Sequence, residues 1–346
     1  MNSLYSRLQF VPKCVNNIRT LTQAKFRPKS EFRVVEVGPR DGLQNESINV
    51  PADIRIEFIN MLSKCGLSSI EVTSFVNPKK VPQMANGAEV FKGITKDPNI
   101  RYPVLVPNMK GFDAAMEAGA TEIAIFGSAS QAFSYRNMSC SIEESLEKFR
   151  EVTEAAREKD IKVRGYVSCV TGCPYEGAVT PYKVAKMTAA MMGLGCYEIS
   201  LGDTIGVGTV GSMKRMLKEV AHVSTPEFLA LHCHDTYGQA LANVLVGLEE
   251  GITCFDSSVG GLGGCPFAKG ATGNLATEDL VYMMQGFGVP IDVDLLALIK
   301  AGRFICKHLD KEPRSRVNNS LWDKVTNNEQ ILELAMNVKS NKDCHY

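Results

Sequence analysis

Apolar residues gather in short runs that recur between residues 32 and 256, and longer amphipathic stretches separate these runs. The runs are four to six residues long and carry many β-branched and aromatic side chains, which is typical of buried strands. Eight of them are predicted to be strands: Phe32–Val37, Ser69–Thr73, Arg101–Val106, Glu122–Phe126, Lys162–Val167, Tyr197–Ser200, Phe228–Leu231 and Thr253–Asp256.

The stretches between these runs have the spacing of amphipathic helices. Asp53–Cys65 carries its apolar residues on one helical face and stops before Gly66, a residue type that commonly follows a helix. Ser141–Lys159 begins with the capping-box sequence Ser-Ile-Glu-Glu. Thr180–Met192 begins with Thr-Pro, a favoured pair for the N-cap and the first helical position.

Eight strand–helix units in about 225 residues predict an α/β fold, a TIM (β/α)8 barrel with additional C-terminal helices. A doubly wound sheet is the competing interpretation, but the Gly-x-Gly-x-x-Gly turn after the first strand is absent. We expect a leader over residues 1–30, the barrel with its closing helices over 31–308, and a polar C-terminal tail over 309–346. In such a barrel the polar residues at the carboxyl ends of the strands face one mouth.

Composition narrows the possible functions. The formal net charge is zero over 346 residues, so bulk charge gives no reason to expect nucleic-acid binding. No apolar run reaches the roughly 18 residues of a membrane helix, and we expect no membrane partner. The eleven cysteines are scattered and odd in number, which indicates a reducing compartment and not a disulfide framework.

The first thirty residues differ from the rest of the chain. They contain six basic residues and no acidic one, and several apolar residues among them fall at helical spacing. This pattern is typical of a mitochondrial transit peptide, and the alternative is a disordered basic tail. We therefore expect the protein in the mitochondrial matrix.

Two histidines end the seventh predicted strand. Because alternate side chains of a strand share a face, His232 and His234 are expected to point the same way. Imidazole is the commonest metal ligand in proteins, so the spacing favours a metal site over two ordinary histidines.

Other strand ends supply the remaining ligands and a cation. Asp41 follows the first strand and can add a carboxylate, while Asn274 can add an amide oxygen. Arg40, beside Asp41, is suited to an oxyanion, and Glu71 and Asp203 end two further strands. Two imidazoles, one carboxylate and one amide fit Mg²⁺ or Mn²⁺. Zinc and a non-heme iron triad remain open alternatives.

A glycine-rich run, Gly260–Gly264, precedes Cys265. It is not a nucleotide-binding P-loop, because no Gly-Lys-Ser/Thr ending follows at the required distance. We interpret it as a mobile lid, too flexible to be a packing element, that carries Cys265 toward the ligand. The alternative for Cys265 is a small buried apolar residue, the usual place of a free cysteine.

The same stretches resemble the hydroxymethylglutaryl-CoA lyase family. The resemblance runs from about residue 32 to residue 308 and includes every motif described above. It rests on the runs VEVGPRDGLQNE from Val35, IEVTSFV from Ile70, YEISLGDTIG from Tyr197, HCHDTYGQALAN from His232 and GGCPFA from Gly263.

The resemblance implies a metal-dependent barrel enzyme, a homodimer, that cleaves 3-hydroxy-3-methylglutaryl-CoA (HMG-CoA) to acetyl-CoA and acetoacetate. This is the last step of leucine breakdown and of ketone-body formation. It also implies Arg40 as an essential cation that contacts the substrate and Cys265 as an active-site thiol. The metal, Mg²⁺ or Mn²⁺, would be bound by Asp41, His232, His234 and Asn274.

The residue chemistry agrees with this reaction. Asp41 or His232 could take the hydroxyl proton, and sequence does not rank them; Cys265 could return a proton to the enolate carbon. Glu71 and Asp203 would orient these groups or shuttle protons. Two rivals are a Claisen-condensing acyl-CoA synthase of the same barrel group and a non-catalytic acyl-CoA-binding barrel. The synthases lack the Gly-Gly-Cys-Pro loop, and a scaffold would have lost some of the ligands.

Overall fold

The computed structural model describes residues 31–264 and 273–326, in which short strands alternate with helices. Each predicted strand is found, with shifts of a few residues at its ends. The second one is interrupted at Glu71 and Val72 and therefore appears as two short strands. The strands are β1 Arg33–Glu36, β2 Ser69–Ile70, β3 Thr73–Ser74, β4 Val104–Leu105, β5 Glu122–Ser128, β6 Lys162–Ser168, β7 Glu198–Asp203, β8 Leu229–Cys233 and β9 Cys254–Ser257.

The strands form one parallel sheet that closes on itself. Their order is β2-β1-β9-β8-β7-β6-β5-β4-β3, so its two ends are the two halves of the second predicted strand. Between these halves, the Glu71 N–H donates to the Glu36 carbonyl at 2.9 Å, and the Val72 N–H donates to the Pro103 carbonyl at 3.0 Å. One extended segment thus pairs with β1 on one side and with the β4 segment on the other. The result is the predicted eight-stranded barrel, and the doubly wound alternative is excluded.

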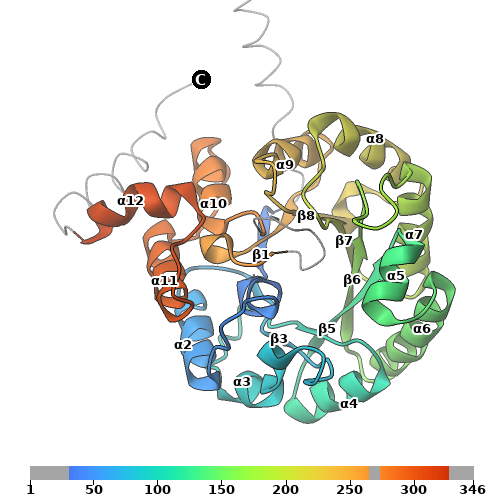
Figure 1. Cartoon of the computed structure of the whole chain (residues 1–346), viewed down its shortest axis with the longest axis horizontal. Coiled ribbons are helices and arrows are strands. Elements are labelled where there is room, and N and C mark those ends of the chain that lie inside the picture. The colour runs from blue at the N-terminus through green and yellow to red at the C-terminus, as the bar shows by residue number, and fades with distance from the viewer. Residues whose placement is uncertain (1–30, 265–272, 327–346) are drawn as a thin grey trace, which may run out of the picture.

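The helices surround the strands as an outer ring (Figure 1). The C-terminal helices close one side, where α12 packs on α10 and α11. α12 lies within the segment predicted to be a polar tail. The helices are α2 Ala52–Leu62, α3 Gly87–Gly93, α4 Met109–Ala118, α5 Gln131–Met138, α6 Ile142–Glu158, α7 Pro181–Gly193, α8 Val210–Val220, α9 Ala240–Glu249, α10 Thr277–Gly286, α11 Leu295–His308 and α12 Arg316–Thr326, with short turns η1 Gly38–Gly42, η2 Pro82–Met84, η3 Pro226–Phe228 and η4 Val259–Gly261.

Local sequence explains where the helices begin. Ser141 and Glu144 form the predicted capping box at the start of α6. Thr180 is at the N-cap of α7 as predicted, with Pro181 in the first turn, but its side chain makes no capping hydrogen bond. The fixed φ of proline is already suited to the first helical turn, so this start does not depend on the threonine hydroxyl.

The barrel has an apolar outer layer and a polar interior. Val163 and Val167 of β6 pack in the large apolar core between the strands and the helices. Arg164 and Tyr166, which alternate with them, reach groups on strands that are not neighbours of β6 and so point into the barrel. Arg164 is only 1% exposed and pairs with Glu198 and Asp256. Charged groups therefore fill the barrel beneath its mouth.

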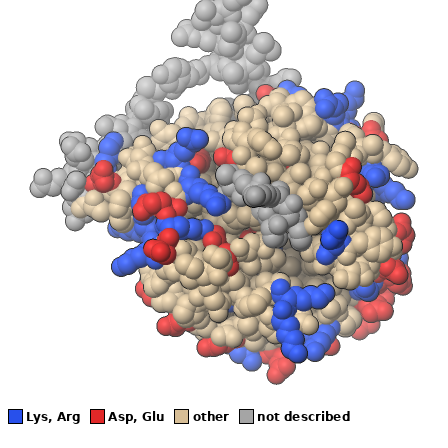
Figure 2. Space-filling view, in the orientation of Figure 1, with Lys and Arg blue, Asp and Glu red and all other residues tan. Residues whose placement is uncertain are grey.

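On the visible face, basic and acidic side chains are interspersed (Figure 2). This matches the zero net charge of the sequence. None of the helices in the described parts of the chain has the length and apolar character that spanning a bilayer requires.

Candidate functional site

Arg40, Asp41 and the two histidines lie at the carboxyl ends of two strands, β1 and β8. β1 runs into η1, a single turn of π-helix that carries Arg40 and Asp41. His232 lies in β8, and His234 follows that strand directly. The backbone at His234 forms an isolated β-bridge with Asn274, and this bridge places Asn274 next to His234. Closure of the sheet thus brings together residues that are up to 233 positions apart.

Asp41, His232 and His234 form a compact cluster that could hold a metal ion. Their ligand atoms all lie within 4.8 Å of one another. The two Nε2 atoms of His232 and His234 are 3.2 Å apart, and His232 Nε2 is 3.8 Å from Asp41 Oδ2. Two imidazole nitrogens and one carboxylate oxygen suit a divalent cation of hard to borderline character, so the donor set fits the predicted metal.

The charges in this cluster are strongly coupled. Burial acts to raise the pKa of Asp41, but the Arg40 guanidinium and the two imidazoles outweigh it and hold that pKa at about 2. Burial and the neighbouring His232 lower the pKa of His234 to about 4. The pKa of His232 is raised: burial acts to lower it, but a hydrogen bond to Asp256 and the charge of Asp41 prevail. The cluster is therefore arranged to attract positive charge, as a proton or as a metal ion.

Arg40 is a buried cation at the edge of the cluster. Its Nη1 donates to Asp41 Oδ1 at 2.6 Å, and its Nε donates to Glu71 Oε1 at 2.5 Å. Burial acts to lower the pKa of Arg40, but these two carboxylates raise it above its ordinary value. The Nη2 group has no hydrogen-bond partner among the described residues, which leaves N–H donors for a ligand.

Tyr166 belongs to the site, and the sequence analysis did not single it out. Its hydroxyl donates to Glu71 Oε2. Its ring lies 5.3 Å from the Arg40 guanidinium and edge-on to His232, with ring centroids 6.2 Å apart. The sequence did carry a signal for it, because alternate residues of a strand face the same side. Tyr166 occupies an inward-facing position of β6, near the carboxyl end of the strand. Asp256 of β9 was missed in the same way, although it contacts His232.

Asp203 lies beside the cluster without a described hydrogen bond to it. Its carboxylate accepts from the Thr171 hydroxyl and from the Gly208 N–H, which is 2.9 Å away. Burial raises the pKa of Asp203, which these hydrogen bonds and the charge of His232 partly offset. Its predicted role stays a prediction. Cys265 lies outside the described residues, so its predicted role also stays a prediction.

Asn274 is at the site with its amide nitrogen directed at the cluster. The Nδ2 group donates to Asp41 Oδ2 at 2.9 Å and to the Leu262 carbonyl at 3.1 Å. The sequence predicted that the amide oxygen would be a ligand. In the structure the amide instead orients the Asp41 carboxylate, and a half-turn of its side chain would be needed to present the oxygen.

The described part of the glycine-rich run is a packed element, and the prediction that it is too flexible to pack is wrong. Gly260 and Gly263 have φ values of 67° and 109°, which glycine adopts readily. The Gly260 N–H donates to Glu278, and the Gly263 carbonyl accepts from Arg314 at 2.8 Å. A Cβ atom at Gly263 would lie 2.7 Å from Asn274 Nδ2. Glycine is therefore required here by close approach to the site.

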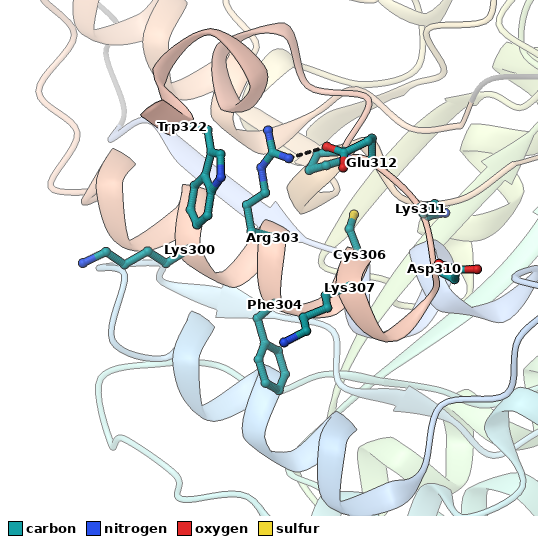
Figure 3. Close-up of a pocket in the computed structure, with 10 residues that line it drawn as sticks. Lys300, Arg303, Phe304, Cys306, Lys307, Asp310, Lys311, Glu312 and Trp322 are labelled. Atoms are coloured by element: carbon teal, nitrogen blue, oxygen red, sulfur yellow. Dashed lines mark hydrogen bonds and ion pairs between the residues drawn. The ribbon is translucent and has the colours of Figure 1, made fainter. Parts of the chain in front are cut away.

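A separate cavity of about 790 Å³ lies over α11 and the segment that leads to α12 (Figure 3). None of the predicted site residues lines it. Its wall is mixed, because Arg303 and three lysines are accompanied by two acidic side chains and by Trp322. We place the functional site at the barrel mouth, where the chemistry converges, and not at this cavity. It is lined by Lys300, Arg303, Phe304, Cys306, Lys307, Asp310, Lys311, Glu312, Pro313 and Trp322.

Comparison with known proteins places the chain among sequences and structures of one kind. The family model described as HMGL-like matches residues 31–305. The chain is 61% identical over 285 residues to the mouse 3-hydroxy-3-methylglutaryl-CoA lyase, cytoplasmic, which covers 82% of this chain and 83% of the mouse protein. It is 59% identical over 287 residues to the Macaca fascicularis hydroxymethylglutaryl-CoA lyase, mitochondrial, covering 83% and 88% of the two chains.

Solved structures show the same likeness. The hydroxymethylglutaryl-CoA lyase from Pseudomonas aeruginosa superimposes with a TM-score of 0.83 and 54% identity, over 85% of this chain and 98% of that one. The carboxyl transferase domain of Rhizobium etli pyruvate carboxylase gives a TM-score of 0.58 at 15% identity, over 86% of this chain and 50% of that chain. This second likeness concerns the fold alone.

Proposed function

The chain belongs to the family of hydroxymethylglutaryl-CoA lyases, and we propose that it cleaves (S)-HMG-CoA to acetyl-CoA and acetoacetate by a retro-Claisen reaction. The observation that carries the proposal is the convergence of Asp41, His232 and His234 beside the buried cation Arg40. The reaction would serve leucine catabolism and ketone-body formation, as the family resemblance implies.

We infer that Asp41, His232 and His234 hold Mg²⁺ or Mn²⁺, with Asn274 as a fourth ligand if its amide turns. The geometry of the three atoms and the charge balance of the cluster support this inference. Such an ion would supply Lewis-acid activation of the substrate hydroxyl and a template for substrate orientation.

The chemistry of cleavage assigns a task to the protein groups. The C3 hydroxyl loses its proton and becomes the ketone of acetoacetate, while the C2–C3 bonding pair moves to C2 and gives the acetyl-CoA enolate. Asp41 Oδ2 and His232 Nε2, which face each other at 3.8 Å, are the candidate acceptors of the hydroxyl proton. The structure leaves both open, as the sequence did, and His232 Nε2 could accept this proton only while its lone pair is not bound to the ion.

Arg40 is proposed to stabilise the enolate oxygen with the N–H donors that its two carboxylate partners leave available. This charge develops only as the bond breaks, so its stabilisation lowers the barrier and not the energy of the bound substrate. Glu71 would fix the guanidinium, and the Tyr166 hydroxyl would in turn fix Glu71. Because these groups are buried, they would hold their arrangement before substrate arrives.

Two further roles are proposed from the sequence. Cys265 would return a proton to the enolate carbon, and Asp203 would orient groups of the site or shuttle a proton. The charge interaction between Asp203 and His232 supports a role for Asp203 near the proton-transfer groups.

The assembly and location of the enzyme are proposals of the same kind. The family resemblance supports a homodimer, which light scattering on the purified protein tests; a monomer at assay concentrations would contradict it. The acid-free basic sequence of residues 1–30 supports import into the mitochondrial matrix. Relatives named mitochondrial and relatives named cytoplasmic both occur, so a fluorescent protein fused to this segment must decide.

The proposed activity is tested with purified protein, HMG-CoA and Mg²⁺, with acetoacetate as the measured product. We expect acetoacetate to appear and to disappear when the protein is first stripped with a chelator. A Claisen-condensing synthase would give none from HMG-CoA, and a binding scaffold would return HMG-CoA unchanged. Either result would reject the proposal.

A further inference from the structure

Asp256 lies beneath the cluster, at the carboxyl end of β9, and is 2% exposed. Its Oδ2 atom is 3.3 Å from His232 Nδ1, the ring nitrogen on the opposite side from the cluster. Its register partner across the β8–β9 ladder is His232 itself. The sheet therefore fixes the carboxylate and the imidazole side by side.

The other contacts of Asp256 determine where the proton of neutral His232 resides. Arg164 donates to Oδ1 from Nη2 at 2.7 Å and to Oδ2 from Nη1 at 3.3 Å, and the Ser200 hydroxyl donates to Oδ2 at 2.6 Å. Arg164 also favours the ionised carboxylate, because its buried guanidinium donates to both oxygens of Asp256 in a two-pronged ion pair. An ionised carboxylate only accepts hydrogen bonds, so His232 must contribute a proton on Nδ1.

That proton leaves the lone pair of neutral His232 on Nε2, the atom that lies 3.2 Å from His234 Nε2. The alternative tautomer would direct an N–H bond into the cluster, where it would compete with any cation. A metal-binding histidine commonly donates its second ring N–H to a carboxylate, which orients the ring and raises its basicity.

We propose that Asp256 is a positioning residue that fixes the tautomer and orientation of His232, with Arg164 and Ser200 holding it in place. The proposal builds on the metal site of the proposed function, but it concerns the protein groups and does not require the lyase reaction itself. Asp256 makes no described contact with Asp41, His234 or Arg40, so it acts through His232.

The variant Asp256→Asn tests this assignment. The short contact from Arg164 Nη2 selects the amide oxygen at the Oδ1 position, which places the amide N–H group toward His232 Nδ1. His232 would then carry its proton on Nε2, as happens when the aspartate of a serine-protease triad is replaced by asparagine. We expect Mn²⁺ affinity, measured by electron paramagnetic resonance of the unbound ion, to fall by about 10–100-fold.

Glu198→Gln is the matched control. Glu198 accepts from Arg164 Nε at 2.8 Å, so both variants remove one of the two carboxylates that neutralise this arginine. Glu198 makes no described hydrogen bond to His232, and we expect its loss to change Mn²⁺ affinity by about threefold or less. Equal losses in the two variants would indicate a general structural effect and would overturn the proposal, as would unchanged affinity in Asp256→Asn.

A second measurement needs no variant of Asp256 and holds even if Asp256→Asn fails to fold. Nitrogen NMR of ¹⁵N-histidine-labelled wild type, free of metal and at alkaline pH, reports which ring nitrogen of neutral His232 bears the proton, with His232→Gln to assign the signal. We expect protonated Nδ1; a proton on Nε2 would refute the assignment. Neither readout uses HMG-CoA, so failure of the acetoacetate assay would reject the lyase proposal and leave this one standing.

Discussion

Arg40 donates from Nη1 to Asp41 Oδ1 at 2.6 Å, so the cation proposed for the enolate is bound to a carboxylate of the proposed metal cluster. The two functions share one partly buried ion pair, and replacing either residue with a neutral one would leave the charge of the other unmatched. Changes at Arg40 are therefore expected to affect catalysis and the charge balance of the cluster together.

Replacing Arg40 with glutamine should lower kcat by on the order of 10²–10³-fold or more, by analogy with removal of an oxyanion donor. Acetoacetate formation at saturating HMG-CoA is the measurement. Arg40→Lys is the informative companion, because it keeps the charge but cannot donate to Asp41 and Glu71 from one planar group. Near-normal turnover in Arg40→Gln would remove Arg40 from the mechanism.

Replacing Tyr166 with phenylalanine removes the hydroxyl that donates to Glu71 and retains the ring beside Arg40. A hydrogen bond to a charged group contributes roughly 1.5–3 kcal/mol, so a drop in kcat of about 10-fold or more is expected if Glu71 positions Arg40. Tyr135→Phe, on the exposed surface of α5, is the control and should keep full activity. A drop in thermal stability with unchanged kcat would show that this hydroxyl is structural only.

Gly263→Ala should impair the site through backbone geometry. An added Cβ meets Asn274 Nδ2 at 2.7 Å, and the φ of 109° is unfavourable for alanine. Gly288→Ala is a matched control, since its φ is also positive, at 71°, but an added Cβ has nothing within 4 Å. We expect kcat or Mn²⁺ affinity to fall at least about tenfold in Gly263→Ala, and Gly288→Ala to lose only about 1 kcal/mol of stability. Equal effects in both variants would mean that the close approach to Asn274 is unimportant.

Two buried glutamates accept hydrogen bonds at the start of the glycine-rich run, and their raised pKa values should make the stability of the fold depend on pH. Glu36 accepts from the Val259 N–H at 3.0 Å, and Glu278 accepts from the Gly260 N–H at 2.9 Å. Burial raises the pKa of Glu36 to about 7 and that of Glu278 to about 8, although hydrogen bonds to their carboxylates partly oppose it. Each folded-state value lies above the ordinary value of 4.5.

Between pH 4.5 and these raised values, the folded protein holds protons that the unfolded chain has released. The contribution of the two glutamates to the free energy of unfolding is therefore fully present at acid pH and is lost as pH rises through about 7 and 8. As pH rises from 4.5 to about 8, the free energy of unfolding should fall less in Glu278→Gln than in the wild type. The difference should be on the order of a few kcal/mol. Chemical denaturation across the pH range measures it, with the exposed Glu147→Gln as control. Parallel curves for Glu278→Gln and wild type would contradict the assignment.

The barrel could be predicted because strands buried on both faces leave continuous apolar runs, and eight of these recur with helices between them. The inward charges were harder to find. Arg164 and Tyr166 alternate with Val163, Gly165 and Val167 in β6. The sequence alone does not show which of these two sets faces the barrel interior, or which strands lie opposite each other across it. The partners of Asp256 thus became apparent only with the register of β8 against β9.

For the site, the residue types at strand ends sufficed to predict Asp41, His232 and His234 as neighbours, because parallel strands end at one mouth. The orientation of Asn274 was beyond reach, since it depends on whether the Leu262 carbonyl accepts from its amide. The packing of Gly260–Gly264 was missed for a related reason. Glycine content indicates conformational freedom, but this freedom is removed by hydrogen bonds with other segments: Glu278 accepts from the Gly260 N–H, and Arg314 donates to the Gly263 carbonyl.

The most direct test of the whole account is anomalous X-ray diffraction from a crystal grown with Mn²⁺. We predict one strong peak within about 2.0–2.3 Å of Asp41, His232 Nε2 and His234 Nε2, beside the Arg40 guanidinium. A crystal in which this cluster binds no Mn²⁺ at saturating concentration, or in which the ion binds at another group of residues, would contradict it.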